Sequence, residues 1–273
     1  MVITLTTDFG LQDPYVGMMR GVILNINPNT TIIDITHDIQ SQNIRQGAFL
    51  IGASFRFFPK GSIHVVVIDP GVGTSRRALL LVTPYAFFLA PDNGLLSRVI
   101  ENSAGSRVTK GNLPHHCEAY ALTNDRYWHH PIAKTFHGRD IFAPVAAHLS
   151  LDVPPAAFGP RVSSIVSLPL HRPRWRRHTL KGQIAHIDRF GNLVTDIPSD
   201  AISKQGEIVV DVCNERVNGL SNNYAERKGL LAIIGSLGYL EVSLSNGNAA
   251  RHLDAHIGDR VVVHIPETPK STS

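Results

Sequence analysis

The first half of the chain alternates between short apolar runs and longer segments whose apolar residues recur at helical spacing. In segment 15–26, for example, Val16, Met19 and Ile23 recur every three or four positions. The predicted strands of this half are 2–6, 31–36, 63–68, 78–83 and 86–90, and the predicted helices are 15–26, 44–57 and 140–149. This alternation predicts an α/β domain with a mostly parallel sheet and helices on its faces.

The second half has a different pattern, because short strand-like runs follow one another with Gly, Asn and Ser between them. The predicted strands are 182–188, 193–197, 207–212, 230–235, 239–244 and 260–264. This pattern predicts a small antiparallel β-barrel, with a sandwich as the alternative. A Pro- and Arg-rich stretch predicts a linker over 169–180. We therefore expect an N-terminal α/β domain over 1–168 and a C-terminal β-barrel domain over 181–273, with a disordered tail from Pro266.

Composition narrows the class of protein. Of 273 residues, 43% are hydrophobic and 18% are charged, which is enough apolar content for a core, and the net charge is only +4. Such a small excess does not by itself indicate a nucleic-acid partner. The two cysteines, Cys117 and Cys213, stand outside any CxxC pattern, so we expect no disulfide framework and a cytoplasmic location. We also expect no signal peptide and no membrane span.

Two polar clusters follow predicted strands of the first half. Asp8 comes after the first strand in the run TTDFG, and Asp69 opens the run DPGVGTSRR after a buried strand. The carboxyl ends of strands in an open parallel sheet point into the ligand crevice. Arg76 can fold back on Asp69 and keep the carboxylate ionised. The structural alternatives are a helix cap for Asp8 and an ion pair within a turn for Asp69 and Arg76.

Two further clusters offer groups for catalysis and binding. His137 precedes predicted helix 140–149 in the run FHGRD, and a helix N-terminus keeps a histidine neutral and able to accept or relay a proton. In the second half, Asp188, Phe190 and Asn192 combine a carboxylate, a ring and an amide, a set that can stack a purine and bind its edge. A capping cluster and a plain hairpin turn are the respective alternatives.

Several well-known motifs are absent from the sequence. It contains no GxxxxGK[ST], GxGxxG, HExxH or GxSxG run, and PDNGL at 91–95 is explained as a turn. His64 with Asp69, and His137 with Asp140, are pairs without a third metal ligand. We therefore expect no metal and no cofactor.

Taken together, the runs resemble the S-adenosyl-L-methionine hydroxide adenosyltransferases, a family related to the fluorinase and chlorinase. The ordered matches are ITLTTDFG at 3–10, PYVG at 14–17, INP at 26–28, DITH at 34–37, and segments 69–77, 91–95, 136–142, 188–192 and 246–250. They cover nearly the whole chain. The resemblance implies hydrolysis of S-adenosyl-L-methionine to adenosine and methionine.

The resemblance also implies roles for individual residues. Asp69, Arg76 and His137 match the catalytic set of the hydrolase branch, which the halogenating branch lacks, so water is expected rather than halide. The family further implies a homotrimer with the ligand between the N-terminal domain of one subunit and the C-terminal domain of the next. The substrate-binding candidates are Asp8 for the ribose diol, Asp188 for the methionine ammonium, Phe190, Asn192 and backbone near Ala250 for adenine, and Ser236 and Tyr239 near methionine.

The expected chemistry is displacement at the ribose 5′ carbon. The sulfonium already leaves readily as a neutral thioether, whereas bulk water, with a pKa of about 15.7, must be oriented and deprotonated. We expect Asp69, held by Arg76, to orient the water, and His137 to accept or relay its proton. The alternatives are a halide-using enzyme of the same fold, a protein that binds S-adenosyl-L-methionine without cleaving it, and a nucleic-acid binder that uses the arginines of 172–177.

Overall fold

The computed structural model describes residues 1–104, 112–202 and 208–265, and the chain divides into two compact units, Met1–Pro169 and Leu170–Ser273. Glu207, where one strand was predicted to begin, and the predicted tail from Pro266 lie outside the described residues. No helix of the described part is long and apolar enough to cross a membrane.

The N-terminal unit is built on a seven-stranded sheet in the order β2-β1-β3-β5-β4-β6-β7. The strands are β1 Val2–Thr7, β2 Thr31–Thr36, β3 Ile63–Val67, β4 Ala78–Val82, β5 Phe87–Pro91, β6 Glu118–Ala121 and β7 Arg161–Val162. Strands β2, β1, β3 and β5 are parallel, whereas β4, β6 and β7 pair antiparallel. The prediction of a mostly parallel sheet was therefore wrong. Only residues 83–86 join β4 to β5, and a parallel crossover needs a much longer connection.

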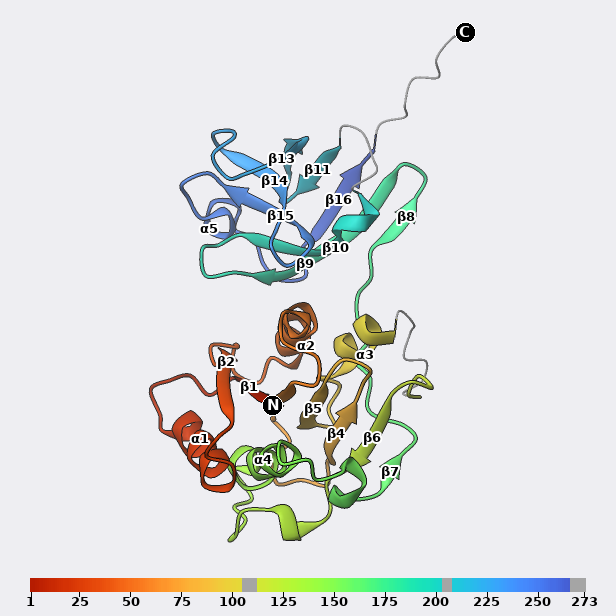
Figure 1. The fold of residues 1–273 in the computed structure, drawn as a ribbon. Helices are drawn as coiled ribbons and strands as arrows, with labels where there is room; N and C mark the ends of the chain where they lie inside the picture. Colours follow the sequence, from red (N-terminus) through yellow and green to blue (C-terminus); the bar gives the residue numbers. More distant parts are fainter. Residues whose placement is uncertain (105–111, 203–207, 266–273) are drawn as a thin grey trace. The chain divides into compact units, whose positions relative to one another are not determined.

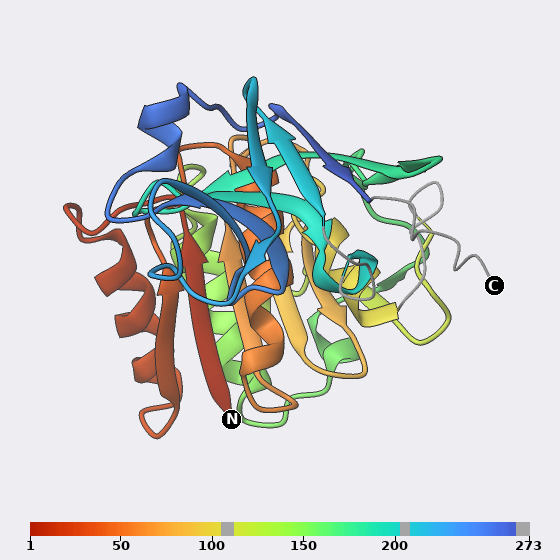
Figure 2. The same ribbon diagram turned by 90° about the horizontal axis from the view of Figure 1, so that it is seen from above.

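Helices cover both faces of this sheet (Figure 1). The helices are α1 Tyr15–Ile26, α2 Ile44–Ser54, α3 Ser97–Ala104 and α4 Ala143–Leu149. One buried cluster joins α1 and α4 to one face, and a second joins α2 and α3 to the other. Figure 2 shows α1 beside β1 and β2 at one edge of the sheet. The unit is thus a three-layer α/β/α structure, as the alternating pattern predicted.

Several elements differ from the predicted ones. Helix α2 ends at Ser54 and continues as the 3-10 turn Phe55–Phe57, and the π-helical turn Gly138–Phe142 precedes α4. The elements α3, β6 and β7 were not predicted. Two short 3-10 turns, Asp125–Tyr127 and Pro155–Phe158, lie in the remaining loops.

The C-terminal unit is a nine-stranded, almost entirely antiparallel sheet in the order β12-β11-β16-β9-β10-β15-β14-β13, with β8 beside β9. Its elements are β8 Arg174–Arg176, β9 Thr179–Ile187, β10 Leu193–Pro198, β11 Val209–Val212, β12 Glu215–Asn218, β13 Leu220–Ser221, β14 Leu230–Ile234, β15 Tyr239–Leu244, α5 Ala249–Leu253, β16 Arg260–His264 and the 3-10 turn Ser199–Ala201. The sheet curls around one apolar core until β12 contacts β14, although no strand pairing within the described residues closes the barrel.

Part of the predicted linker belongs to this sheet. Strand β8 lies inside 169–180 and pairs antiparallel with the start of β9. Arg174, Arg176 and Arg177 therefore lie on the hairpin of β8 and β9, whereas Arg172 precedes it.

Candidate active site

The loop after β3 carries the first two candidate catalytic residues. It turns tightly, because the backbone N–H of Val72 donates to the carbonyl of Asp69 at 3.2 Å. Gly73 has φ +76°, and a Cβ there would lie 2.3 Å from the carbonyl oxygen of Lys134. Only glycine fits this approach without displacing the backbone. The loop is thereby packed against the segment that leads to His137.

Asp69, Arg76 and His137 are joined by direct hydrogen bonds, although 61 residues separate Arg76 from His137. Arg76 donates from Nε to Oδ1 of Asp69 at 3.0 Å and from Nη2 to Oδ2 of the same carboxylate. The Nη2 atom also lies 2.7 Å from Nδ1 of His137. The side chains of Asp69 and Arg76 are only 5% and 10% exposed. Such a bidentate, shielded pair fixes both partners in one geometry.

The hydrogen bond with Arg76 defines the state of His137. A guanidinium only donates, so Nδ1 of His137 accepts and the proton of the neutral ring is on Nε2. Burial and the neighbouring Arg76 charge lower the pKa of His137 below its usual 6.5, with Asp69 and Asp140 opposing that shift. His137 is therefore a neutral imidazole whose Nδ1 lone pair is already engaged.

A cavity of about 380 Å³ lies at this edge of the sheet, and Asp8, Asp69 and His137 all line it. Its wall includes Phe9, Tyr15 and Phe136, which pack edge to face with ring centres 5.2–5.9 Å apart. These rings were not among the predicted site residues, although Phe9 and Phe136 stand directly beside Asp8 and His137 in the sequence. An aromatic wall of this kind favours a cationic or flat ligand.

The remaining predicted binding residues lie in the C-terminal unit, where three of them form one hairpin between β9 and β10. Oδ1 of Asp188 accepts from the backbone N–H groups of Phe190 and Asn192, and Oδ2 accepts from Nδ2 of Asn192, each at 2.9 Å. Asn192 is buried, and the Phe190 side chain is 75% exposed. Asp188 thus orders its own hairpin and keeps about one lone-pair position for a ligand.

Ala250, Ser236 and Tyr239 belong to neighbouring segments of the same unit. The backbone N–H of Ala250 donates to the carbonyl of Gly191 at 2.9 Å, which fastens α5 to the Asp188 hairpin. Ser236 is exposed in the loop between β14 and β15, and Tyr239 begins β15 with its carbonyl accepting from Gly235 at 2.9 Å. Because the Ala250 N–H is already used, this group is not a free donor for adenine.

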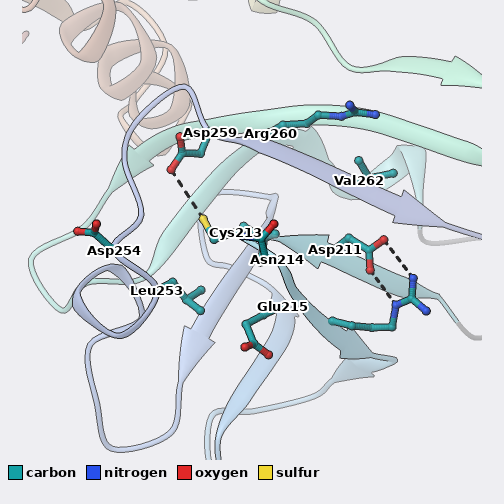
Figure 3. Close-up of a pocket in the computed structure, with 11 residues that line it drawn as sticks. Asp211, Cys213, Asn214, Glu215, Leu253, Asp254, Asp259, Arg260 and Val262 are labelled. Atoms are coloured by element: carbon teal, nitrogen blue, oxygen red, sulfur yellow. Dashed lines mark hydrogen bonds and ion pairs between the residues drawn. The ribbon is translucent and has the colours of Figure 1, made fainter.

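A larger cavity of about 780 Å³ lies elsewhere in the C-terminal unit. Figure 3 shows its acidic lining, in which Cys213 donates to Asp259 and Asp211 binds Arg216. None of the predicted site residues is among the described residues that line it. Across 1–104, 112–202 and 208–265, no group of three or more His, Cys, Asp or Glu side chains could hold a metal ion.

The chain was compared with protein-family models and curated proteins. The model described as the SAM hydroxide adenosyltransferase N-terminal domain matches residues 3–159, and the model of the corresponding C-terminal domain matches residues 182–262. An (R)-S-adenosyl-L-methionine hydrolase of Salinispora tropica is 34% identical over 272 residues, covering 96% of this chain and 97% of the relative. A hydrolase of the same name from Methanocaldococcus jannaschii is 32% identical, with 96% and 95% covered.

More distant relatives and solved structures agree with this assignment. A fluorinase of Nocardia brasiliensis is 26% identical, covering 97% of each chain. The crystal structure of an uncharacterized conserved protein from Thermotoga maritima has a TM-score of 0.88 and 33% identity, and the match covers 97% of this chain and 100% of that one. With both family domains matched in order, this chain belongs to the SAM hydroxide adenosyltransferase family.

Proposed function

We propose that this protein hydrolyses S-adenosyl-L-methionine to adenosine and L-methionine. The observation that carries the proposal is the joint Asp69–Arg76–His137 cluster at one cavity. Relatives at 32–34% identity over nearly the whole chain are named (R)-S-adenosyl-L-methionine hydrolase. We propose that the same reaction takes place here, with Asp69, Arg76 and His137 as the catalytic residues.

In the proposed reaction a water oxygen attacks the ribose 5′ carbon as the carbon–sulfur bond breaks. The bonding pair moves to sulfur, so the sulfonium leaves as the neutral thioether of methionine. The attacking oxygen becomes a strongly acidic oxonium, which gives one proton to the Asp69 carboxylate and on to solvent. Because the leaving group is already charged, no metal or acid is required for its departure. Positioning and base assistance together supply the acceleration.

The hydrogen bonds of Arg76 indicate which catalytic role each of the three residues takes. Asp69 is the proton acceptor, because Nδ1 of His137 already accepts from Arg76 and its Nε2 carries hydrogen. His137 accepts from the same Nη2 atom of Arg76 that binds Asp69, and it relays a proton only after Arg76 releases Nδ1. Through its two hydrogen bonds Arg76 holds the Asp69 carboxylate in the orientation in which it accepts the proton.

Substrate binding is proposed to use both units. Phe9, Tyr15 and Phe136 line the cavity and offer ring faces to the sulfonium, and Asp8 binds the ribose diol. In the C-terminal unit the exposed ring of Phe190 stacks adenine while Asn192 reads the purine edge. Asp188 uses its remaining lone pair for the methionine ammonium, with Ser236 and Tyr239 near the same end, and the Ala250 segment supports the hairpin through Gly191.

We further propose a homotrimer in which the N-terminal unit of one subunit and the C-terminal unit of the next enclose the ligand. The family resemblance supports this assembly, and light scattering coupled to size exclusion measures it. The cytoplasmic location also stays a prediction, in keeping with Cys117 and Cys213, which are both free thiols.

The reaction is tested by incubating the protein with S-adenosyl-L-methionine in oxygen-18 water, with a chelator in one arm, and analysing the products by mass spectrometry. We expect adenosine carrying the label at its 5′ hydroxyl in both arms. Formation of 5′-chloro-5′-deoxyadenosine in chloride buffer would instead indicate a halogenase. Intact substrate after prolonged incubation would indicate a binding protein, and either result refutes the proposal.

A further inference from the structure

Two neighbouring segments frame the Asp8 carboxylate: the turn after β1 at residues 8–10 and the loop after β2 at residues 37–42. Oδ2 of Asp8 accepts from the backbone N–H of Gln42 at 2.7 Å. In the opposite direction, the backbone N–H of Gly10 donates to the carbonyl of His37 at 2.9 Å. The turn that presents Asp8 to the cavity is therefore held by the loop that contains His37.

Buried side chains beneath the turn add a second connection. Thr7 is completely buried and His37 is 4% exposed. Oγ1 of Thr7 lies 2.8 Å from Nδ1 of His37, and it accepts from the backbone N–H of Phe9 at 3.2 Å. Neither Thr7 nor His37 is among the described residues that line the cavity, whereas Asp8 and Phe9 are.

The surroundings of His37 set the direction of this chain of hydrogen bonds. Burial and the charge of Arg20 lower the pKa of His37 to about 4, so the ring is neutral. Its Nε2 lies 3.2 Å from Oδ1 of Asp34, although the two atoms are not aligned as a hydrogen bond and have no hydrogen-bond partner within the described residues. Because a carboxylate only accepts, the ring proton belongs on Nε2, and Nδ1 accepts the Thr7 hydroxyl hydrogen.

Because the Thr7 hydroxyl hydrogen is donated to Nδ1 of His37, the lone pairs of Oγ1 remain to accept from the Phe9 N–H. The order of donation is therefore Phe9 backbone to Thr7 hydroxyl to His37 imidazole, with Asp34 facing the far ring nitrogen. Asp34 also forms an ion pair with Arg20 of α1, and this pair holds Asp34 at the His37 end of the hydrogen-bonded series. The reversed order is disfavoured, since it would turn the Nε2 lone pair of His37 toward the Asp34 carboxylate and would take from the Thr7 hydroxyl hydrogen its acceptor on Nδ1.

We propose that Thr7 and His37 are positioning residues that fix the turn at 8–10 and so hold the Asp8 carboxylate in place for the ribose diol of an adenosyl substrate. The inference rests on the proposed function. It extends that function by assigning the position of the ribose-binding Asp8 carboxylate to a buried Thr–His pair that the substrate does not contact. Loss of the pair weakens nucleoside binding, while the Asp69 cluster continues to drive the chemical step.

The sharpest test compares Thr7→Val, which has the same shape but no hydroxyl, with Thr7→Ser, which retains it. For Thr7→Val we expect KM for S-adenosyl-L-methionine and Kd for adenosine, measured by calorimetry, to rise about three- to tenfold, the range for one neutral hydrogen bond. The kcat should stay within about twofold, and Thr7→Ser should stay close to the wild type. A second pair is His37→Leu against His37→Asn, whose amide oxygen can replace Nδ1 and restore affinity.

Asp8 itself supplies the decisive control. In an Asp8→Ala background the effect of Thr7→Val on adenosine affinity should disappear, because the group being positioned is gone. An undiminished effect in that background, or unchanged KM and Kd in folded Thr7→Val and His37→Leu, overturns the inference. Failure of the wild-type protein both to cleave the substrate and to bind adenosine would refute the proposed function instead.

Discussion

Replacing Asp69 by Asn tests the chemical step most directly. Asn has the same size and its amide oxygen can still accept from Arg76, but its NH₂ faces the Nη2 donor and it cannot take a proton. Proton acceptance by a positioned base typically contributes about 10²–10⁴-fold. At about 1.36 kcal/mol per tenfold, this corresponds to roughly 3–5 kcal/mol of barrier. We therefore expect kcat to fall by at least about a hundredfold, and affinity for S-adenosyl-L-methionine to stay nearly unchanged.

The structure provides a matched control in Asp92, a buried carboxylate that receives hydrogen bonds from Nε and Nη2 of Arg77 away from the cavity. Single-turnover quench experiments with excess enzyme would measure the chemical step, and calorimetry would measure binding. Asp92→Asn should lower Tm without a comparable loss of kcat. If Asp69→Asn retained kcat within about tenfold of the wild type, or lost binding with unchanged chemistry per bound molecule, Asp69 would not be the proton acceptor.

Three further predictions follow from the site and the core. Gly73→Ala should lower Tm and abolish turnover, because a Cβ at φ +76° would lie 2.3 Å from the Lys134 carbonyl oxygen. As the control, Gly71→Ala should resemble the wild type in thermal melts and rate assays, because a Cβ there has no contact closer than 3.5 Å. Burial and the neighbouring Arg76 guanidinium lower the pKa of His137, so kcat/KM should stay level as the pH falls to 6.5 and should decline only at lower pH. A decline in kcat/KM centred at pH 6.5 or higher would contradict the assigned neutral ring. Burial lowers the pKa of His64 from 6.5 to about 4, so the unfolded chain takes up the proton first, and this one group should lower the free energy of unfolding by about 3 kcal/mol between pH 6.5 and pH 4. Denaturant titrations of His64→Leu should show a pH slope that is smaller by this amount, while the contribution of His37, whose pKa is also lowered to about 4, remains.

Much of the fold could be predicted because the hydrophobic period reports which face of an element is buried. The predicted helix 15–26 coincides with α1, and the strand at 31–36 coincides with β2. The period carries no information about strand direction, which is why β4 was placed in a mostly parallel sheet. The short connection at residues 83–86 was the available signal, since it admits only a hairpin. Short elements such as α3 and β7 have too few periods to stand out from loops.

The candidate site divides in the same way. Residue type and family motifs already identified Asp69, Arg76 and His137 as candidates, because the chemistry of a carboxylate, a guanidinium and an imidazole follows from residue type alone. The sequence could not show which of these groups already have hydrogen-bond partners. Arg76 occupies Nδ1 of His137, and Asp188 accepts three hydrogen bonds from its own hairpin, all at distances under 3 Å that only the folded structure defines.

The sequence by itself therefore determined the family, the two-part organisation and the chemical identity of the candidate groups. Tertiary structure decided the mixed sheet, the aromatic wall beside Asp8 and the buried contact between Thr7 and His37, 30 residues apart. The physical reason is that local pattern is set by neighbours along the chain. Hydrogen-bond direction and tautomer are set instead by atoms that only folding brings within a few ångströms.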